Sequence, residues 1–83
     1  MKRLTSKPRE FVGFGANFMT PNVLSYWRVG KLAVEISQGE GIRREPIFGV
    51  TVKPDETFKL SKMVTSLALA MHYLEELEDM QTK

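Results

Sequence analysis

The spacing of apolar residues changes in the last third of the chain. Before that point, apolar and polar residues alternate at every second position, as they do in strands that bury one face. In the last third, apolar residues recur every three or four positions, which is typical of an amphipathic helix. The order of the two patterns predicts an α+β fold, with a three- to four-stranded antiparallel sheet packed on one C-terminal α-helix.

Residues 23–37 carry the strongest strand pattern and predict a β-hairpin. We expect a two-residue turn at Val29 and Gly30, because glycine accepts the positive φ of a tight turn. This register places on one face Val23, Trp27, Leu32, Val34 and Ile36. It places on the other face Tyr26, Arg28, Lys31, Ala33 and Glu35. Valine followed by glycine is not a favoured hairpin pair, so a longer loop is the alternative.

Two further segments have strand-like patterns. Residues 47–52 predict a core strand that directs Phe48, Val50 and Val52 inward. Residues 10–19 also alternate, and they predict a half-buried strand whose Phe14 and Phe18 belong to the core. The alternating positions of that segment are Val12, Phe14, Ala16 and Phe18. Two glycines interrupt it, so whether the segment joins the sheet stays open.

The helical pattern predicts a helix that begins between residues 61 and 66 and ends near residue 79. Ser61 is the N-cap of the longer alternative, and Thr65 or Ser66 is the N-cap of the shorter one. The stripe expected to face the core consists of Leu60, Met63, Val64, Leu67, Ala70, Met71, Leu74 and Leu77. The segment lacks glycine and proline and is rich in good helix formers.

Length and composition restrict the organisation of the chain. It has 83 residues, of which 42% are hydrophobic and 27% charged, as expected of one globular domain. Residues 1–9 include four basic residues and few apolar ones. Such a segment buries too little surface to offset the entropy of ordering it. We therefore predict a flexible basic arm over residues 1–9 and a single α+β domain over residues 10–83.

The sequence contains no cysteine, which excludes thiol catalysis and cysteine-based zinc sites and favours a reducing environment. No apolar run approaches the roughly 20 residues that a membrane span requires. No apolar region follows the basic N-terminus, as it would in a signal peptide. We expect a cytoplasmic protein that does not contact the membrane.

Candidate catalytic groups are sparse. His72 is the only histidine, and it lies opposite the apolar stripe without other metal-ligating residues at suitable spacing. The carboxylates near the end of the predicted helix lie in a wet and flexible region. No serine has a nucleophile-elbow pattern or a base beside it. We therefore expect a protein that is not an enzyme and that uses no cofactor, metal or small-molecule substrate.

A second strip of the predicted helix is a candidate partner-binding surface. Leu69, Tyr73 and Met80 lie together there, away from the core direction. Single exposed apolar residues are common, so the strip is either ordinary surface or a seam for another protein or a second copy of the chain. The protein-binding alternative is our first functional hypothesis, in which this small protein occupies a surface of a partner.

The second hypothesis is DNA binding by the open face of the sheet. Residues 1–62 contain eleven basic and six acidic residues. The basic and aromatic candidates are Tyr26, Arg28, Lys31, Arg43 and Arg44. A sheet backed by a helix can enter the major groove, where arginine reads guanine edges and lysine contacts phosphates. Residues 30–36 (GKLAVEI) resemble a strand of plant ethylene-response-factor DNA-binding domains, and the resemblance implies the same order of strands and helix.

A longer resemblance covers roughly residues 24–77. Residues 35–42 (EISQGEGI), 47–52 (IFGVTV), 60–62 (LSK) and 73–77 (YLEEL) are similar to small uncharacterised proteins of bacterial viruses and mobile elements. The resemblance carries no activity. It implies a bacterial host cytoplasm and a regulator or inhibitor that binds a host complex.

Overall fold

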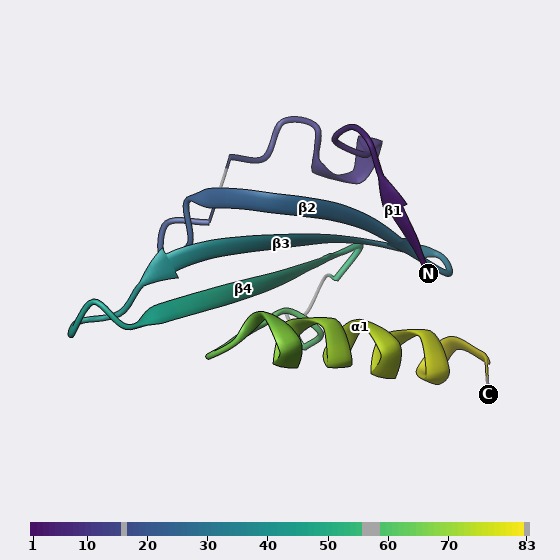
Figure 1. Cartoon of the computed structure of the whole chain (residues 1–83). Coiled ribbons are helices and arrows are strands. Elements are labelled where there is room, and N and C mark those ends of the chain that lie inside the picture. Colours follow the sequence, from purple (N-terminus) through teal and green to yellow (C-terminus); the bar gives the residue numbers. More distant parts are fainter. Residues whose placement is uncertain (16, 56–58, 83) are drawn as a thin grey trace.

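The computed structural model describes residues 1–15, 17–55 and 59–82 as a five-stranded antiparallel sheet with one long helix against it (Figure 1). The strands are β1 (Lys2–Leu4), β2 (Asn22–Val29), β3 (Leu32–Glu40), β4 (Pro46–Lys53) and β5 (Lys62–Val64). The helices are a single 3₁₀ turn, η1 (Arg9–Phe11), and the α-helix α1 (Leu67–Thr82). The strands lie side by side in chain order. The α+β class is therefore confirmed, but the sheet has five strands where three or four were predicted.

The hairpin of β2 and β3 preserves the predicted faces although its turn is displaced. The turn consists of Gly30 and Lys31, so that Val29 lies opposite Leu32, and Gly30 has a φ of +59°. Each β2 residue from Ser25 to Arg28 therefore pairs with a β3 residue two positions beyond the predicted one. Because side chains alternate between the faces, a shift of two residues leaves these side chains on their predicted faces. Trp27 consequently lies opposite Val34.

Val23 is the exception to the predicted register. A β-bulge between Val23 and Ser25 places Val23 opposite Ser37, whereas Ser25 lies opposite Ile36. The extra residue in β2 reverses the alternation beyond that point. The predicted pairing of Val23 with Ile36 is therefore wrong, and Val23 lies on the face away from α1.

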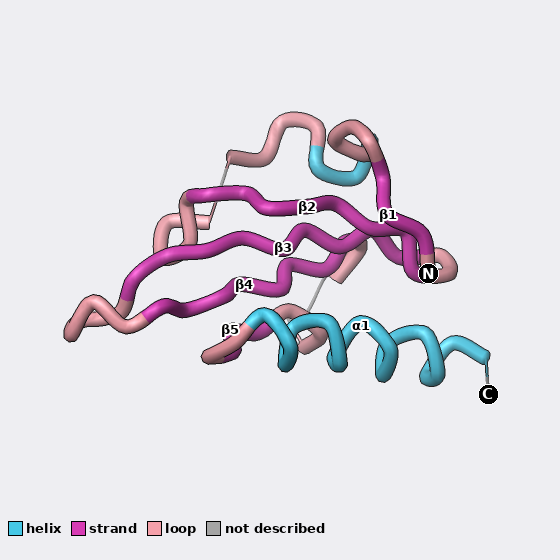
Figure 2. The backbone as a smooth tube through the Cα atoms, in the orientation of Figure 1, coloured by secondary structure: helices cyan, strands magenta, loops and turns pink. Residues whose placement is uncertain are grey.

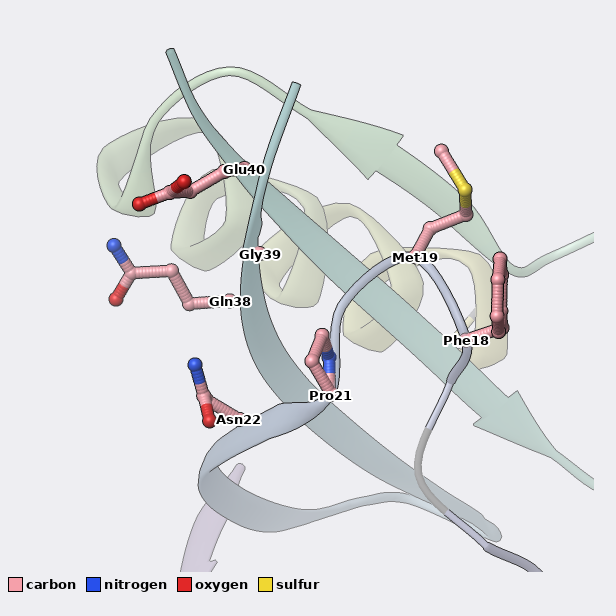
Figure 3. Close-up of a pocket in the computed structure, with 7 residues that line it drawn as sticks. All are labelled: Phe18, Met19, Pro21, Asn22, Gln38, Gly39 and Glu40. Carbon is pink, nitrogen blue, oxygen red and sulfur yellow. The ribbon is translucent and has the colours of Figure 1, made fainter. Parts of the chain in front are cut away.

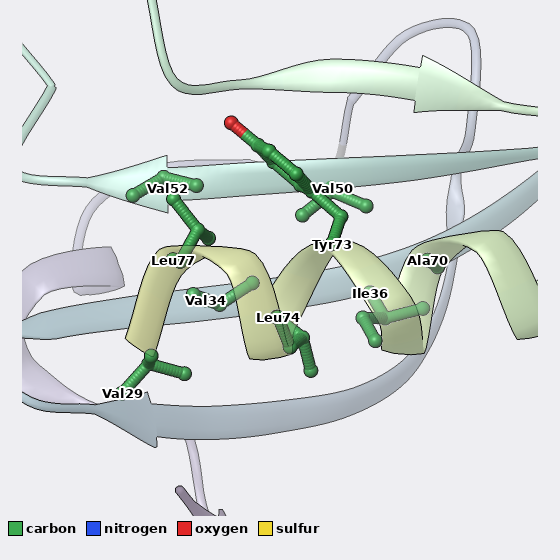
Figure 4. Close-up of a cluster of buried hydrophobic side chains, with 9 residues drawn as sticks. All are labelled: Val29, Val34, Ile36, Val50, Val52, Ala70, Tyr73, Leu74 and Leu77. Atoms are coloured by element: carbon green, nitrogen blue, oxygen red, sulfur yellow. The ribbon is translucent and has the colours of Figure 1, made fainter. Parts of the chain in front are cut away.

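The main core lies between the sheet and α1 (Figure 4). It contains Val29, Val34, Ile36, Val50, Val52, Ala70, Tyr73, Leu74 and Leu77. The predicted strand at residues 47–52 is confirmed within β4, where Phe48, Val50 and Val52 are buried. None of the helices in the described parts of the chain is long and apolar enough to cross a membrane.

The start of the helix follows the shorter of the two predicted alternatives. The Ser66 hydroxyl accepts a hydrogen bond from the Leu69 N–H at 3.1 Å, as an N-cap side chain does. Residues 62–64 form the edge strand β5 beside the beginning of α1 (Figure 2). Met63 lies opposite Gly49 on the face away from α1, and Leu67 is also exposed. The prediction that these two residues face the core is wrong. Met63 belongs to β5, where the helical spacing does not apply, and Leu67 is the first residue of α1, where its side chain is exposed.

Residues expected to form a flexible arm instead form the other edge of the sheet. Lys2–Leu4 of β1 pair with residues 26–28 of β2, and Pro8 is buried. The Met1 ammonium group also pairs with the Glu78 carboxylate. Apolar content did not indicate this strand, because strand pairing joins backbone N–H and C=O groups whatever the side chains are.

The predicted strand at residues 10–19 is absent from its described residues. Phe11 is buried at the end of η1, whereas Phe14 and Phe18 are exposed, so their assignment to the core is wrong. Ala16 lies outside the described residues. The 3₁₀ turn η1 and the positive φ of +87° at Gly13 take the place of the extended conformation that the alternation predicted.

Candidate functional site

The sheet face away from α1 is covered by a second layer of chain. This covering segment comprises residues 5–15 and 17–21. The Phe11 ring packs against Tyr26, with 5.6 Å between the ring centroids. The Glu10 carboxylate accepts hydrogen bonds from both terminal nitrogens of Arg28, at 2.5 and 3.0 Å. Two of the residues predicted to contact DNA therefore have partners within the fold.

A buried carboxylate lies on the same face. Only 4% of Glu35 is exposed, and burial raises its pKa above the usual value. A hydrogen bond with Tyr26 and the charge of Lys7 oppose this rise. The Lys7 ammonium group also donates a hydrogen bond to the Phe14 carbonyl at 2.9 Å. Among these contacts, the attraction between Lys7 and Glu35 joins the covering segment to the sheet.

The remaining residues predicted to contact DNA lie at opposite ends of the sheet. Lys31 belongs to the turn between β2 and β3, and Arg43 and Arg44 belong to the hairpin between β3 and β4. The nine residues of β3 separate these turns, a distance of roughly 30 Å at about 3.3 Å of rise per residue. The structure therefore does not gather the five predicted residues into one surface.

The predicted helix seam is interrupted at its centre. Tyr73 is only 8% exposed and packs in the main core, and its hydroxyl donates to the Leu60 carbonyl at 2.5 Å. The Lys62 ammonium group lies over the same ring, 3.8 Å from its centroid. Leu69 and Met80 remain exposed on either side of it. A partner therefore meets two separate apolar side chains here in place of a continuous stripe.

A different apolar feature protrudes at the end of the sheet where β2 begins. We call residues 17–20 the Phe18 turn. The Thr20 N–H donates to the Asn17 carbonyl at 3.1 Å, and the Met19 N–H donates to the Asn17 side chain at 2.8 Å. Phe18 at the tip is 94% exposed, and Met19 beside it is also exposed. Tight turns usually carry glycine, proline or small polar residues, so the local structure does not require these two side chains.

Contacts with β3 and β4 fix the position of the Phe18 turn. Thr20 is fully buried, and its hydroxyl accepts a hydrogen bond from Ser37 at 2.8 Å. A Cβ atom on Gly39 would lie 2.0 Å from the Met19 carbonyl oxygen. A Cβ atom on Gly49 would lie 2.5 Å from the Thr20 hydroxyl oxygen. The turn thus fits closely against two glycines, while its largest side chain points into solvent.

A hollow of about 520 Å³ adjoins this turn. Figure 3 shows Phe18 and Met19 at the bend of the covering segment and Pro21 and Asn22 where the chain enters β2. The opposite wall comes from β3. The lining residues are Phe18, Met19, Pro21, Asn22, Gln38, Gly39 and Glu40. The sequence did not indicate this site, because the glycines that position it lie about 20 and 30 residues away along the chain.

The neighbouring hairpin presents a second apolar side chain. Ile42 at its tip is fully exposed, and it follows Glu40 of the hollow by two residues. The Glu45 carboxylate accepts a hydrogen bond from the Arg43 N–H at 2.8 Å, and the Gly41 N–H donates to the Glu45 carbonyl at 2.8 Å. These bonds order the tip of the hairpin.

The solvent side of α1 carries an exposed histidine between two carboxylates. The His72 ring lies 3.3 Å from Glu76 and 3.9 Å from Glu75 on the solvent side of α1. Across the parts of the chain that the structure describes, no three histidine, cysteine or acidic residues are grouped so that they could hold a metal ion. Glu75 and Glu76 follow His72 by three and four residues, the spacing of neighbouring side chains on an exposed helix face.

Comparison of the chain with protein-family models, curated proteins and solved structures gives no match.

Proposed function

We propose that this protein is a small binding module that attaches to a partner protein through the Phe18 turn. The observation that carries the proposal is the almost complete exposure of Phe18 on a turn that the rest of the fold holds in place. The Phe18 ring fits an apolar cleft of the partner, with Met19 and Ile42 contacting its margins.

The energetics of association support this assignment. Burying a phenylalanine side chain contributes about 1.5–3 kcal/mol relative to leaving it exposed. Central aromatic anchors of this kind carry a large share of the binding energy in protein interfaces. Because the Asn17 and Thr20 hydrogen bonds already order the turn, binding costs less conformational entropy than it would for a flexible loop.

Alternative surfaces have less support. DNA binding by the sheet face would require Tyr26 and Arg28 to leave their partners Phe11 and Glu10. The helix seam lacks Tyr73 at its centre. We therefore assign partner binding to the end of the sheet.

Photocrosslinking tests the proposal. Benzoylphenylalanine in place of Phe18 is expected to crosslink a defined protein in a bacterial lysate, and the same group in place of His72 on the helix is expected not to. The unlabelled Phe18→Ser protein, which keeps the fold because Phe18 is exposed, should compete at least tenfold more weakly than the original chain.

The matched control removes the two exposed residues of the helix seam. A chain with Leu69→Ser and Met80→Ser should compete as well as the original chain. Equal competition by the Phe18→Ser protein would contradict the proposal, and loss of competition only in the seam variant would move the binding surface to α1.

A further inference from the structure

Strand β1 pairs with three of the eight residues of strand β2. Residues 2–4 pair with residues 28–26, so the remaining part of β2, residues 22–25, extends beyond the end of β1. No strand lies along its outer side among the described residues of the chain. An uncovered strand edge presents backbone N–H and C=O groups that a further strand can pair with. We call residues 22–25 the free edge.

The covering segment leaves space beside the free edge. After Leu4 the chain bends at Thr5 and Ser6 and passes over the sheet. A hollow of about 570 Å³ remains where β1 would have continued. Its lining consists of Arg3, Leu4, Thr5, Ser6, Lys7, Val23, Leu24, Ser25 and Tyr26. An added strand would lie about 4.8 Å from β2, in line with β1.

The side chains around the hollow indicate the ligand. Arg3 supplies a positive charge at the hollow, and Lys7 adds a second one although its ammonium group also donates to the Phe14 carbonyl and acts on Glu35; the lining contains no carboxylate. Val23 and Leu24 are partly exposed and supply apolar contact. Carboxylates combined with small apolar side chains complement this lining, which indicates an acidic peptide in extended conformation. A nucleic-acid backbone fits less well, because the edge also presents carbonyl oxygens that repel phosphate.

We propose that the free edge of β2 binds an acidic, extended peptide segment, which adds to the sheet as a strand between Arg3 and Lys7. Backbone pairing supplies a mode of recognition that tolerates many sequences, and the positive charge at the hollow, chiefly that of Arg3, selects for acidic ones. This site is separate from the Phe18 turn and does not depend on the function proposed for that turn.

A titration of the ¹⁵N-labelled full chain with the peptide acetyl-Glu-Val-Glu-Val-Glu-Val-amide tests the proposal. We expect chemical-shift changes and slower amide exchange at residues 22–26. The Arg3→Glu exchange should weaken binding about tenfold, and Arg3→Gln, which removes the charge with less effect on β1, should give an intermediate loss. The Phe18→Ser protein should bind the peptide as the original chain does.

Three control ligands separate strand addition from other attraction. The same peptide with N-methylated valines keeps its charge but cannot pair with a strand, and it should not bind. The peptide with lysine in place of glutamate should not bind either. Equal binding of the N-methylated peptide, shifts confined to other residues, or no shift at millimolar peptide would overturn the proposal. Stronger binding of oligothymidylate at the same residues would also overturn it and assign the hollow to phosphate.

Discussion

Glu10 and Arg28 form a bidentate ion pair that joins η1 to β2 on the sheet face away from α1. The two hydrogen bonds measure 2.5 and 3.0 Å. With the contact of Phe11 on Tyr26 and the bond between Ser37 and Thr20, they hold the covering segment in place. The sheet therefore has an apolar core on one side and a mixed polar and aromatic layer on the other.

The Glu10–Arg28 pair predicts part of the acid sensitivity of the fold. Hydrogen bonding to Arg28 lowers the pKa of Glu10 from 4.5 to about 2. Because the pKa is lowered in the folded state, the stabilisation is complete above pH 4.5 and is lost as the pH falls toward 2. Since water reaches the pair, Glu10→Gln should reduce the free energy of unfolding at neutral pH by about 1 kcal/mol.

Urea unfolding at several pH values measures this effect. The difference between the original chain and Glu10→Gln should shrink as the pH falls through the acid range. An exchange at exposed Glu40, Glu40→Gln, is the matched control. A Glu10→Gln difference that stays constant with pH would show that the ion pair does not titrate as described.

Glu35 predicts a pH effect of the opposite sign. Burial raises its pKa in the folded state, so the native protein takes up this proton more readily than the unfolded chain does. The contribution of Glu35 to stability therefore decreases as the pH rises through its folded pKa. A Glu35→Gln protein should be at least as stable as the original chain at neutral pH, by thermal unfolding. A clear loss of stability would indicate that Tyr26 and Lys7 outweigh the cost of burial.

Gly39 should be necessary for the Phe18 turn. The methyl group of Gly39→Ala would collide with the Met19 carbonyl, since their separation would be 2.0 Å. We expect a loss of about 1–3 kcal/mol in the free energy of unfolding, as for other overpacked sites. Crosslinking through position 18 should weaken as well. Gly15→Ala is the control, because nothing lies within 4 Å of its added atom. An unchanged stability of the Gly39→Ala protein would contradict the close fit of the Phe18 turn against Gly39.

Gln81 should hold the last turn of α1 against the hairpin of β2 and β3. Its amide nitrogen donates to the Val29 carbonyl at 2.8 Å, and its carbonyl oxygen accepts from the Lys31 N–H at 2.8 Å. Gln81→Ala should cost about 1–2 kcal/mol, since two hydrogen bonds are lost. Hydrogen exchange should accelerate in the last helical turn. The control is Thr82→Ala, one residue further along, which should leave the rate of hydrogen exchange unchanged. Equal acceleration by the two substitutions would argue against the Gln81 contacts.

Leu74 and Leu69 should differ sharply although both belong to α1. Leu74 is fully buried, and a Leu74→Ala exchange should lower the free energy of unfolding by about 2–5 kcal/mol. Leu69 is 49% exposed, and Leu69→Ala should change the free energy of unfolding by about 0.5 kcal/mol or less. Chemical denaturation compares the two proteins directly. Similar losses would mean that the helix packs with a different face.

Much of the fold was predictable because strand and helix periods are local properties. The pattern correctly divided Trp27, Val34 and Glu35 between the two faces of the hairpin even though its turn is displaced. It also placed Ala70, Leu74 and Leu77 in the helix core. The edge strands were not predicted, because three residues contain too little periodicity and their pairing depends on the neighbouring backbone.

The candidate site was less predictable. Phe18 belongs to an alternation of the same kind as those that contain the buried residues of the hairpin and of β4, and the pattern alone cannot distinguish a buried side chain from an exposed one. The Phe18 side chain is exposed because the backbone of the Phe18 turn packs against β3 and β4, at Ser37, Gly39 and Gly49. Their effect depends on contacts between distant parts of the chain.

The sequence by itself determined an α+β domain with a central hairpin, a third core strand and a C-terminal helix, because each follows from the spacing of apolar residues within a short window. Only the tertiary structure decided that Phe11 is buried and Phe18 exposed, that Arg28 is held by Glu10, and that β1 leaves part of β2 uncovered. These features arise from steric fit, ion pairing and backbone pairing between segments far apart in the chain, which local periodicity does not encode.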